Sequence, residues 1–534
     1  MRLLEARRVA RRRDHISPGV RHLQPPWRRC RRHAAARASK KGREPRNRTH
    51  LRASLPLMIR VLPALGLAML LFSGCSGDDP VVSDADREAG AEAHPQLLAE
   101  FGGAYSGEES AYVVRLGGKV ANAAGLGGRC TFTLVNSDVV NAFAVPGCYI
   151  YVTRGLMGIV NSEGELASVL AHEVGHITAR HSQRQQRRSI WRGLGVLAVQ
   201  VLTGSERLTR IAGEAAAFFT LRYSRGQEYE ADDLGLTYLR GAGYDPYAAA
   251  DMLDALGRQE SFLARTRGRD EARSLPEWTR THPLTTNRVT RAREQAAATG
   301  LEADALPENE LPFLREVDGL LYGDDPEQGF VIGRRFAHPV MRIGFEAPQG
   351  FTLTNSPQAI LIEGPDGLRG EFAGGPMPPG GLEAYASSVL RQLLGDTPVE
   401  PGEVRRVVVN GVPSIQSQMR IQTSDGAVTL SLAAYRGAGD GAYHFVMIGN
   451  PSAPSAAAVA SLFGSFRLLG EEEARRLKPR WIRVAKVSPG ETAQSLAARM
   501  ATDAPLEHFL MLNGRSGDQP VRPGELVKIV TYTR

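Results

Sequence analysis

His172-Glu-Val-Gly-His176 is the stretch on which the interpretation of this sequence rests. Histidines four positions apart lie on one face of an α-helix, one turn from each other, so both imidazoles can bind one ion. A helix is predicted here because Ser162-Glu-Gly-Glu165 has the spacing of a capping box and apolar residues follow it at helical intervals. Glu173 then lies beside the ion, as the group that takes a proton from a metal-bound water.

A third protein ligand has to come from elsewhere in the chain. The metzincin zinc pattern would require a glycine at position 179 and a histidine at position 182, but these positions hold Ala179 and Ser182. His181 is one residue out of register with that pattern, so we interpret it as a residue at the end of the helix. The other common solution is a carboxylate on a later helix.

Glu228 and Asp232 offer such a carboxylate, since they are four residues apart on a predicted helix. Glu228 is the expected ligand, and Asp232 is expected to accept a hydrogen bond from a ligand histidine and so fix its tautomer. Glu230 points to another face of the helix and is the second candidate for the ligand. A solvated acidic helix face is the alternative interpretation of this cluster.

The formal charge of +8 does not indicate a nucleic-acid-binding protein. Residues 1–57 hold 18 Lys and Arg against 3 Asp and Glu, which leaves 47 basic and 54 acidic residues in the remainder. The part expected to fold is therefore mildly acidic, and no nucleic-acid partner is predicted. We interpret residues 1–57 as a basic disordered tail, or as an upstream extension of the reading frame with the true start at Met58.

Residues 58–75 have the features of a secretory signal. One basic residue precedes an apolar run from Val61 to Phe72, and Ser73-Gly-Cys75 supplies a small-residue site that resembles the lipobox of bacterial lipoproteins. The run is too short to span a bilayer, which takes about 20 residues. Cys75 is therefore the expected site of lipidation, and a periplasmic protein anchored in the outer membrane is expected. An ordinary cleaved signal is the alternative.

Cys130 and Cys148 are the cysteines that remain once the tail and the anchor account for Cys30 and Cys75. Each lies in a strand-like run, and disulfides persist in the compartments to which a secretory signal leads. A disulfide between neighbouring strands is predicted, with two buried thiols as the alternative.

The chain is too long for one core, and its composition changes along its length. We expect a multidomain α+β protein. Its parts would be a mainly helical unit with a small β-sheet over residues 84–300, an α+β domain over residues 330–470 and a small module over residues 481–534. Residues 301–329, rich in Pro and Gly, and the charged residues 471–480 are predicted linkers.

Further motifs accompany the histidine stretch. They are Asn141-Ala-Phe-Ala-Val-Pro-Gly147, Val152-Thr-Arg-Gly-Leu156, Glu228 with Asp232, and Thr281-His-Pro-Leu284 with Arg288. With these motifs the chain resembles metallopeptidase family 48, which includes the HtpX-type and CAAX-prenyl-protease-type enzymes. The resemblance covers about residues 84–300 and is closest to the periplasmic branch. It implies a gluzincin fold with one Zn²⁺ held by His172, His176 and Glu228.

The resemblance also implies roles for residues outside this ligand set. Asn141, Ala142 and Phe143 would lie on the edge strand of the small sheet, where a peptide substrate adds as a further strand. His282 would lie on a loop that caps the zinc as a fourth ligand, or would stabilise the oxyanion, and a structural histidine is the third possibility. Arg288 would anchor this loop by a salt bridge.

The later parts of the chain carry weaker resemblances. Trp481-Ile-Arg-Val-Ala-Lys-Val-Ser-Pro-Gly490, with Pro523-Gly-Glu-Leu-Val-Lys-Ile529, resembles a LysM module, which implies a β-α-α-β fold that binds peptidoglycan. A degenerate module used only for packing is the alternative. Residues 330–470, with turn pairs such as Asn410-Gly411, faintly resemble PsbP-like α/β domains.

These resemblances imply a zinc metalloendopeptidase of the bacterial cell envelope that cleaves misfolded or stalled envelope proteins. Polypeptide substrates, peptidoglycan and, through the lipid, the membrane are the expected partners. The alternative is an envelope chaperone or assembly factor with latent protease activity, anchored to peptidoglycan.

Overall fold

A computed structural model describes residues 81–184, 223–266, 282, 286–395, 402–423, 426–449, 453–517 and 519–534. The predicted basic tail and the predicted signal segment with Cys75 lie outside the described residues. Within these ranges, no helix combines the length and the apolar character that crossing a membrane requires.

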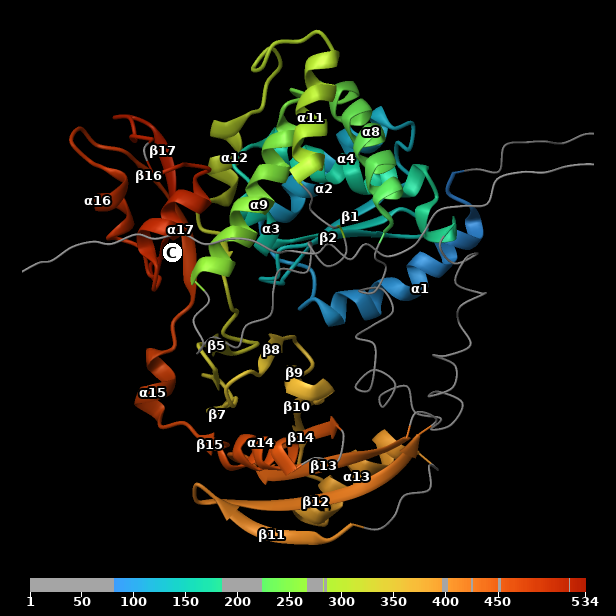
Figure 1. Cartoon of the computed structure of the whole chain (residues 1–534), viewed down its shortest axis with the longest axis vertical. Coiled ribbons are helices and arrows are strands. Elements are labelled where there is room, and N and C mark those ends of the chain that lie inside the picture. The colour runs from blue at the N-terminus through green and yellow to red at the C-terminus, as the bar shows by residue number, and fades with distance from the viewer. Residues whose placement is uncertain are drawn as a thin grey trace, which may run out of the picture. The chain divides into compact units, whose positions relative to one another are not determined.

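The first part of the described chain is a helical layer on a three-stranded sheet (Figure 1). Its strands are β1 (Thr131–Val135), β2 (Ala142–Val145) and β3 (Tyr149–Thr153), in the order β1-β3-β2. β3 pairs parallel with β1 and antiparallel with β2, which leaves β2 at one edge. Its helices are α1 (Asp84–Glu100), α2 (Glu108–Ala123), α3 (Arg154–Ile159), α4 (Glu163–Thr178), α8 (Arg225–Gly241), α9 (Ala248–Thr266) and α11 (Thr286–Ala298).

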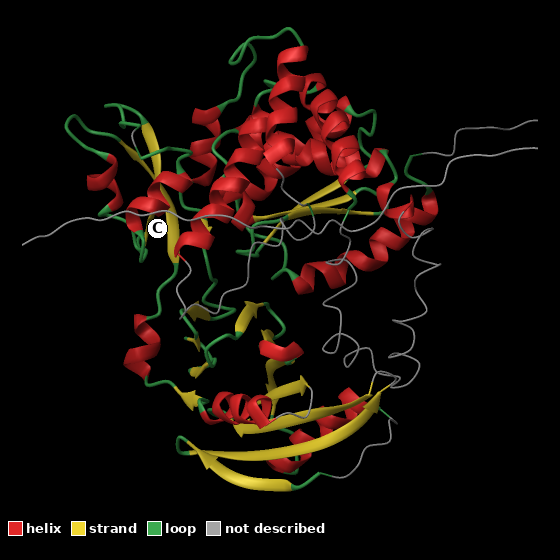
Figure 2. Cartoon of the chain, in the orientation of Figure 1, coloured by secondary structure: helices red, strands yellow, loops and turns green. Residues whose placement is uncertain are grey.

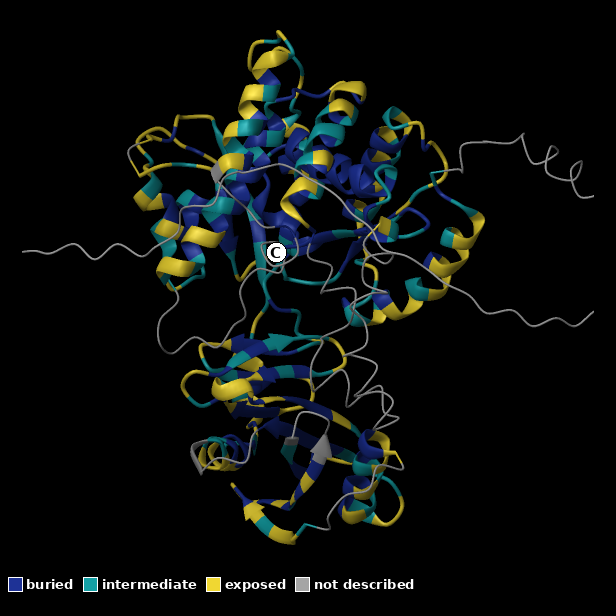
Figure 3. Cartoon of the chain, turned by 45° about the vertical axis from the view of Figure 1, so that its right-hand side comes forward, coloured by how far each residue is buried: buried dark blue, intermediate teal, exposed yellow. Residues whose placement is uncertain are grey.

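Helix α4 lies in the interior of this layer, and Figure 3 shows mostly buried residues where the helices pack together. All residues from 164 to 177 are buried, so α4 is enclosed on every side rather than on one face. The Ser162 hydroxyl accepts a hydrogen bond from the backbone N–H of Glu165, as predicted. The reciprocal bond of a capping box is absent, because the Glu165 carboxylate accepts from the N–H of Asn161 instead.

Residues 301–329 are not the linker that their Pro and Gly content predicted. They contain α12 (Glu310–Val317) and β4 (Leu321–Tyr322). Phe313, Leu314 and Val317 of α12 are buried in the same core as α2 and α4. The burial of these side chains stabilises an ordered segment. The sequence did not predict this segment, because turn-forming residues surround it.

The middle part is an antiparallel α+β domain (Figure 2). A four-stranded sheet has the order β15-β7-β6-β5 and a seven-stranded sheet the order β11-β12-β13-β14-β10-β9-β8. The elements are β5 (Phe330–Ile332), β6 (Arg335–His338), β7 (Ile343–Glu346), β8 (Thr352–Asn355), β9 (Ile360–Glu363), the short 3₁₀ helix η1 (Pro365–Gly367), β10 (Arg369–Pro376), α13 (Gly381–Leu394), β11 (Val404–Val409), β12 (Val412–Thr423), β13 (Gly426–Arg436), β14 (Gly441–Gly449), α14 (Ala453–Gly464) and β15 (Arg467–Leu468).

The hairpin between β11 and β12 shows why the turn residues matter. Asn410 and Gly411 both have positive φ, 47° and 80°, as a two-residue hairpin turn requires. The helices α13 and α14 pack in separate hydrophobic clusters, each with alternate residues of β13. The multidomain α+β prediction is confirmed at this level.

The C-terminal part has the element order β-α-α-β and follows α15 (Glu471–Arg476), which begins in the predicted charged linker. It comprises β16 (Arg480–Lys486), α16 (Ala493–Ala497), α17 (Pro505–Leu512) and β17 (Leu526–Thr531). It is not a separate module, because β16 also pairs with β4, and Ile482 and Leu512 belong to the core of α4. Buried Lys528 donates to the carbonyls of Gly158 and Val160, at 3.0 and 2.7 Å.

Candidate metal centre

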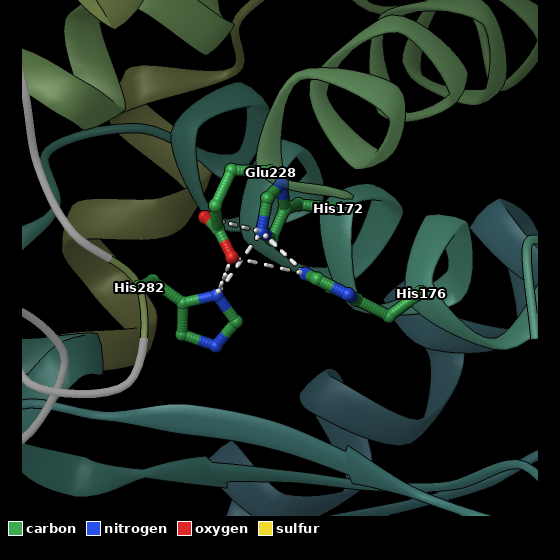
Figure 4. A group of neighbouring side chains, drawn as sticks. All are labelled: His172, His176, Glu228 and His282. Carbon is green, nitrogen blue, oxygen red and sulfur yellow. Dashed lines mark hydrogen bonds and ion pairs between the residues drawn. The ribbon is translucent and has the colours of Figure 1, made fainter. Parts of the chain in front are cut away.

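Four side chains from three segments point toward one another in the interior (Figure 4). His172 and His176 come from α4, Glu228 from the first turn of α8, and His282 from the chain before α11. All four residues are buried, and each offers a ligand atom within 4.8 Å of the others. The structure therefore brings together the two histidines and the carboxylate that the sequence pointed to, together with His282.

The distances within this group suit a small tetrahedral ion. Two nitrogen donors bound to one zinc ion at the tetrahedral angle lie about 3.3 Å apart. The Nε2 atom of His172 lies 3.0 Å from Nε2 of His176 and 3.4 Å from Nδ1 of His282. Each of these two Nε2 atoms lies 3.7 Å from a carboxylate oxygen of Glu228. Imidazole and carboxylate donors are also the set that zinc takes in catalytic sites, so these residues fit zinc.

The charge states of His176 and Glu228 suit a cation as well. Burial lowers the pKa of His176 well below its usual value, and the charges of neighbouring groups lower it further to a smaller extent. The ring is therefore kept in the neutral form that binds a metal. Burial alone would raise the pKa of Glu228, but the charges of His282, His172 and Arg288 and the hydrogen bond from His282 hold it below its usual value. Glu228 is therefore ionised at neutral pH.

Asp232 and Arg288 contact the four-residue donor group from its α8 side. The Nδ1 atom of His172 lies 3.0 Å from Oδ1 of Asp232, the contact expected of an acceptor that fixes the histidine tautomer. Arg288, buried on α11, donates to both oxygens of Asp232 at 2.7 and 2.9 Å and to Glu228 at 2.8 Å. One guanidinium thus orients the carboxylates of Glu228 and Asp232.

Glu173, on α4, lies next to this group of possible donors. It is 1% exposed, and its Oε1 atom lies 3.7 Å from Nε2 of His282. Among the described residues, this oxygen has no hydrogen-bond partner. Burial raises the pKa of Glu173. A buried carboxylate with an open acceptor site beside the donor group is suited to take a proton from a water molecule.

The remaining acidic candidate of α8 lies outside the donor group. Glu230 accepts from Arg184 at 2.8 Å, and its carboxylate lies 3.2 Å from Nε2 of His181. It therefore occupies a different place from the one that a third ligand would take.

Two contacts of His176 did not stand out in the sequence. The ring of Tyr223 stacks on the ring of His176, with centroids 3.9 Å apart. His181 brings its Nδ1 atom within 2.8 Å of Nδ1 of His176. The backbone of Arg180, with φ at 52°, turns the chain back after α4, and this turn brings His181 to His176. Residue spacing alone does not reveal it, because the turn uses no glycine.

The predicted substrate strand and cysteines lie in and beside the small sheet. Ala142 and Phe143 belong to the edge strand β2, and Asn141 directly precedes it, with its carbonyl accepting from the backbone N–H of Thr153. The described chain leaves the outer side of β2 without a paired strand. Cys130 and Cys148 form a disulfide between the starts of β1 and β3.

Comparisons with known proteins bear on the same region. Residues 108–296 match the model of Peptidase family M48. A β-barrel assembly-enhancing protease of Yersinia pestis is 34% identical over 195 residues, which cover 35% of this chain and 38% of that protein. The mitochondrial metalloendopeptidase OMA1 of Arabidopsis thaliana is 36% identical over 125 residues, which cover 23% of this chain and 25% of that protein. The matches thus span well under half of either relative.

Among solved structures, the cyanobacterial PsbP of Synechocystis sp. PCC 6803 covers 25% of this chain and 91% of its own, with 12% identity and a TM-score of 0.21. A TM-score this low supports no argument about the middle domain. The resemblances to PsbP-like domains and to LysM therefore stay predictions. The matched residues 108–296 contain the donor group and Glu173, and the chain therefore carries a metallopeptidase domain of peptidase family M48.

Proposed function

We propose that this chain is a zinc-dependent endopeptidase of the bacterial cell envelope, which hydrolyses peptide bonds of misfolded or stalled envelope proteins. The observation that carries this proposal is the buried group of His172, His176, Glu228 and His282, with the carboxylate of Glu173 beside it. The family of residues 108–296 supports the same activity.

In the proposed reaction, His172, His176 and Glu228 would hold the ion. When bound, zinc would polarise the peptide carbonyl and acidify a water molecule. Glu173 takes a proton from the attacking water as the oxygen–carbon bond forms. It then delivers that proton to the amide nitrogen as the carbon–nitrogen bond breaks. The raised pKa of Glu173 suits both steps, since a general base works best when its pKa approaches the working pH.

The substrate would bind along β2. An extended peptide that pairs with this edge strand gains backbone hydrogen bonds, which require no particular substrate sequence. Asn141, Ala142 and Phe143 would align the peptide beside α4, which β2 contacts in the structure. Such backbone recognition suits an enzyme for unfolded chains.

His282 gives the proposed enzyme a resting form. Its Nδ1 atom lies 3.1 Å from Oε1 of Glu228 and 3.4 Å from Nε2 of His172, where a fourth ligand would be. Four protein ligands close a zinc site, whereas a catalytic site keeps one position open. We therefore infer that His282 caps the site and has to move before a substrate carbonyl can enter.

The envelope location rests on the predicted signal segment and on the name of the Yersinia relative, a β-barrel assembly-enhancing protease. Lipidation at Cys75 would anchor the chain to the outer membrane, and the C-terminal β-α-α-β part would contact peptidoglycan. No nucleic-acid partner is proposed.

Hydrolysis of an unfolded protein tests the proposal. Purified wild-type protein with zinc is expected to cleave reduced casein, and a chelator is expected to stop the cleavage. Glu173→Gln should retain zinc and lose cleavage, whereas Glu472→Gln, on the exposed side of α15, should behave as wild type. Full cleavage by Glu173→Gln would refute the role of this carboxylate. A zinc-loaded wild type that binds unfolded protein without cutting it would favour the chaperone alternative, to which the closed donor group also lends support.

A further inference from the structure

His181 is fully buried beside the metal centre, although it lies beyond the end of α4. The helix ends at Thr178, and Arg180 adopts a left-handed backbone conformation with φ at 52°. A non-glycine residue adopts this conformation at some cost in free energy, so the surrounding structure has to hold it there. The result is that the His181 ring turns back toward α4 and lies against the ring of His176.

The contact between these rings fixes their tautomers. His176 presents Nε2 to the donor group, 3.0 Å from Nε2 of His172, so its own proton lies on Nδ1. That Nδ1 atom lies 2.8 Å from Nδ1 of His181. A hydrogen bond between two nitrogens needs one proton and one lone pair. His176 therefore donates and His181 accepts, which places the proton of His181 on Nε2.

Glu230 completes this chain of contacts. Nε2 of His181 donates to Oε2 of Glu230 at 3.2 Å, and the same oxygen accepts from Arg184 at 2.8 Å. The two ligand histidines of α4 therefore have different supports. His172 contacts the carboxylate of Asp232 directly, whereas His176 reaches the carboxylate of Glu230 only through a second imidazole.

We propose that His181, held by Glu230, is a positioning residue for the metal site, because it accepts the Nδ1 hydrogen of His176 and aims Nε2 of that ring at the cation. This inference rests on the proposed function, since it assigns His181 a role toward the zinc ion. His181 itself binds no metal in this account. Its contribution is the acceptor lone pair of one ring atom, and this distinguishes it from a residue that merely fills space.

The test is the zinc dissociation constant of the full chain, measured by competition with a chromophoric chelator. His181→Ala is expected to weaken zinc binding about 10–100-fold, the usual effect of losing a hydrogen-bond partner of a ligand histidine. His181→Asn keeps an acceptor oxygen near the position of Nδ1 and should recover most of the affinity. The visible spectrum of the cobalt-loaded protein should change in His181→Ala and return in His181→Asn.

A surface pair provides the matched control and guards against misfolding of the His181 variants. Glu230 and Asp233 both lie on α8, and their side chains are 44% and 45% exposed. Glu230→Ala should weaken zinc binding in the same direction as His181→Ala but by less. Asp233→Ala removes a carboxylate paired with Arg291 and should leave the affinity unchanged.

The outcomes separate this inference from the proposed function. Wild-type affinity in both His181→Ala and Glu230→Ala would overturn the inference and leave the proposed function intact. Equal losses in His181→Ala and His181→Asn would also overturn it, because packing rather than an acceptor would then be responsible. A wild type that binds no zinc would overturn the proposed function itself.

Discussion

The Nδ1 atom of His172 lies 3.0 Å from Oδ1 of Asp232, one helical turn along α8 from Glu228. The same face of α8 thus carries Glu228, a proposed metal donor, and Asp232, an acceptor that orients the proposed donor His172. Burial alone would raise the pKa of Asp232, but the charge of Arg288 and the hydrogen bond and charge of His172 hold it well below its usual range. Asp232 is therefore ionised at neutral pH and can accept a hydrogen bond from His172.

Removal of this acceptor should weaken the metal site without abolishing it. Asp232→Ala leaves the ring of His172 free to rotate and is expected to lower zinc affinity about 10–100-fold. Asp232→Asn keeps an acceptor oxygen and should lose less. Chelator competition measures both variants. Unchanged zinc affinity in Asp232→Ala would show that packing alone holds the His172 ring.

Arg288 should be more important for folding than for zinc binding. It is 1% exposed and neutralises both Glu228 and Asp232. Arg288→Met leaves the buried carboxylate of Glu228 and the largely buried one of Asp232 without their cation, which is expected to lower the free energy of unfolding of the zinc-free protein by about 3–5 kcal/mol. Urea unfolding in the presence of a chelator gives this value. A loss below about 1 kcal/mol would mean that water reaches the two carboxylates in the folded state.

His282 should restrain the enzyme if it caps the metal site. In His282→Ala a coordination position opens, so casein cleavage is expected to be faster than in the wild type while zinc is retained by the other three ligands. The initial rate of casein cleavage at saturating zinc measures the effect. A rate reduced about 10²–10³-fold would assign His282 to oxyanion stabilisation instead.

The contact of the C-terminal part with the peptidase domain should be sensitive to acid. His508 is buried, with Nε2 2.7 Å from the hydroxyl of Tyr322, Nδ1 3.0 Å from Oγ1 of Thr502 and its ring stacked on Phe262. Burial, with a smaller effect of Arg480, lowers the pKa of His508 to about 3.

Because the pKa of His508 is lower in the folded than in the unfolded chain, the neutral imidazole contributes its full stability above about pH 6.5, the usual pKa of a histidine. This contribution is lost as the pH falls from about 6.5 toward 3. At pH 5 the loss is expected to be about 2 kcal/mol. His508→Gln does not titrate, so the stability difference between wild type and variant should shrink by that amount from pH 7.5 to pH 5. Urea unfolding at both pH values measures it, and a constant difference would contradict the lowered pKa.

The sequence was sufficient where the structure depends on local spacing. Four-residue intervals on a helix placed His172 with His176 and Glu228 with Asp232, because residues at this interval share a helix face whatever surrounds them. The pair Asn410-Gly411 likewise predicted a hairpin turn, because few residues adopt two successive positive φ values.

The sequence was insufficient where long-range packing decides the structure. The contact between His181 and His176 depends on the left-handed backbone conformation of Arg180. The sequence does not predict this conformation, because arginine rarely adopts it. The docking of the C-terminal part depends on Lys528 and the carbonyls of Gly158 and Val160, which lie more than 360 positions away. The α12 segment was mistaken for a linker because its buried Phe313 and Leu314 have their partners in other helices.

The metal site is tested by the zinc stoichiometry and zinc affinity of wild type beside Glu228→Ala. We expect one tightly bound zinc ion per chain in the wild type. We expect loss of tight binding in Glu228→Ala, with a folded chain by circular dichroism. Zinc bound by Glu228→Ala with wild-type affinity would contradict the assignment of this carboxylate and with it the proposed metal site.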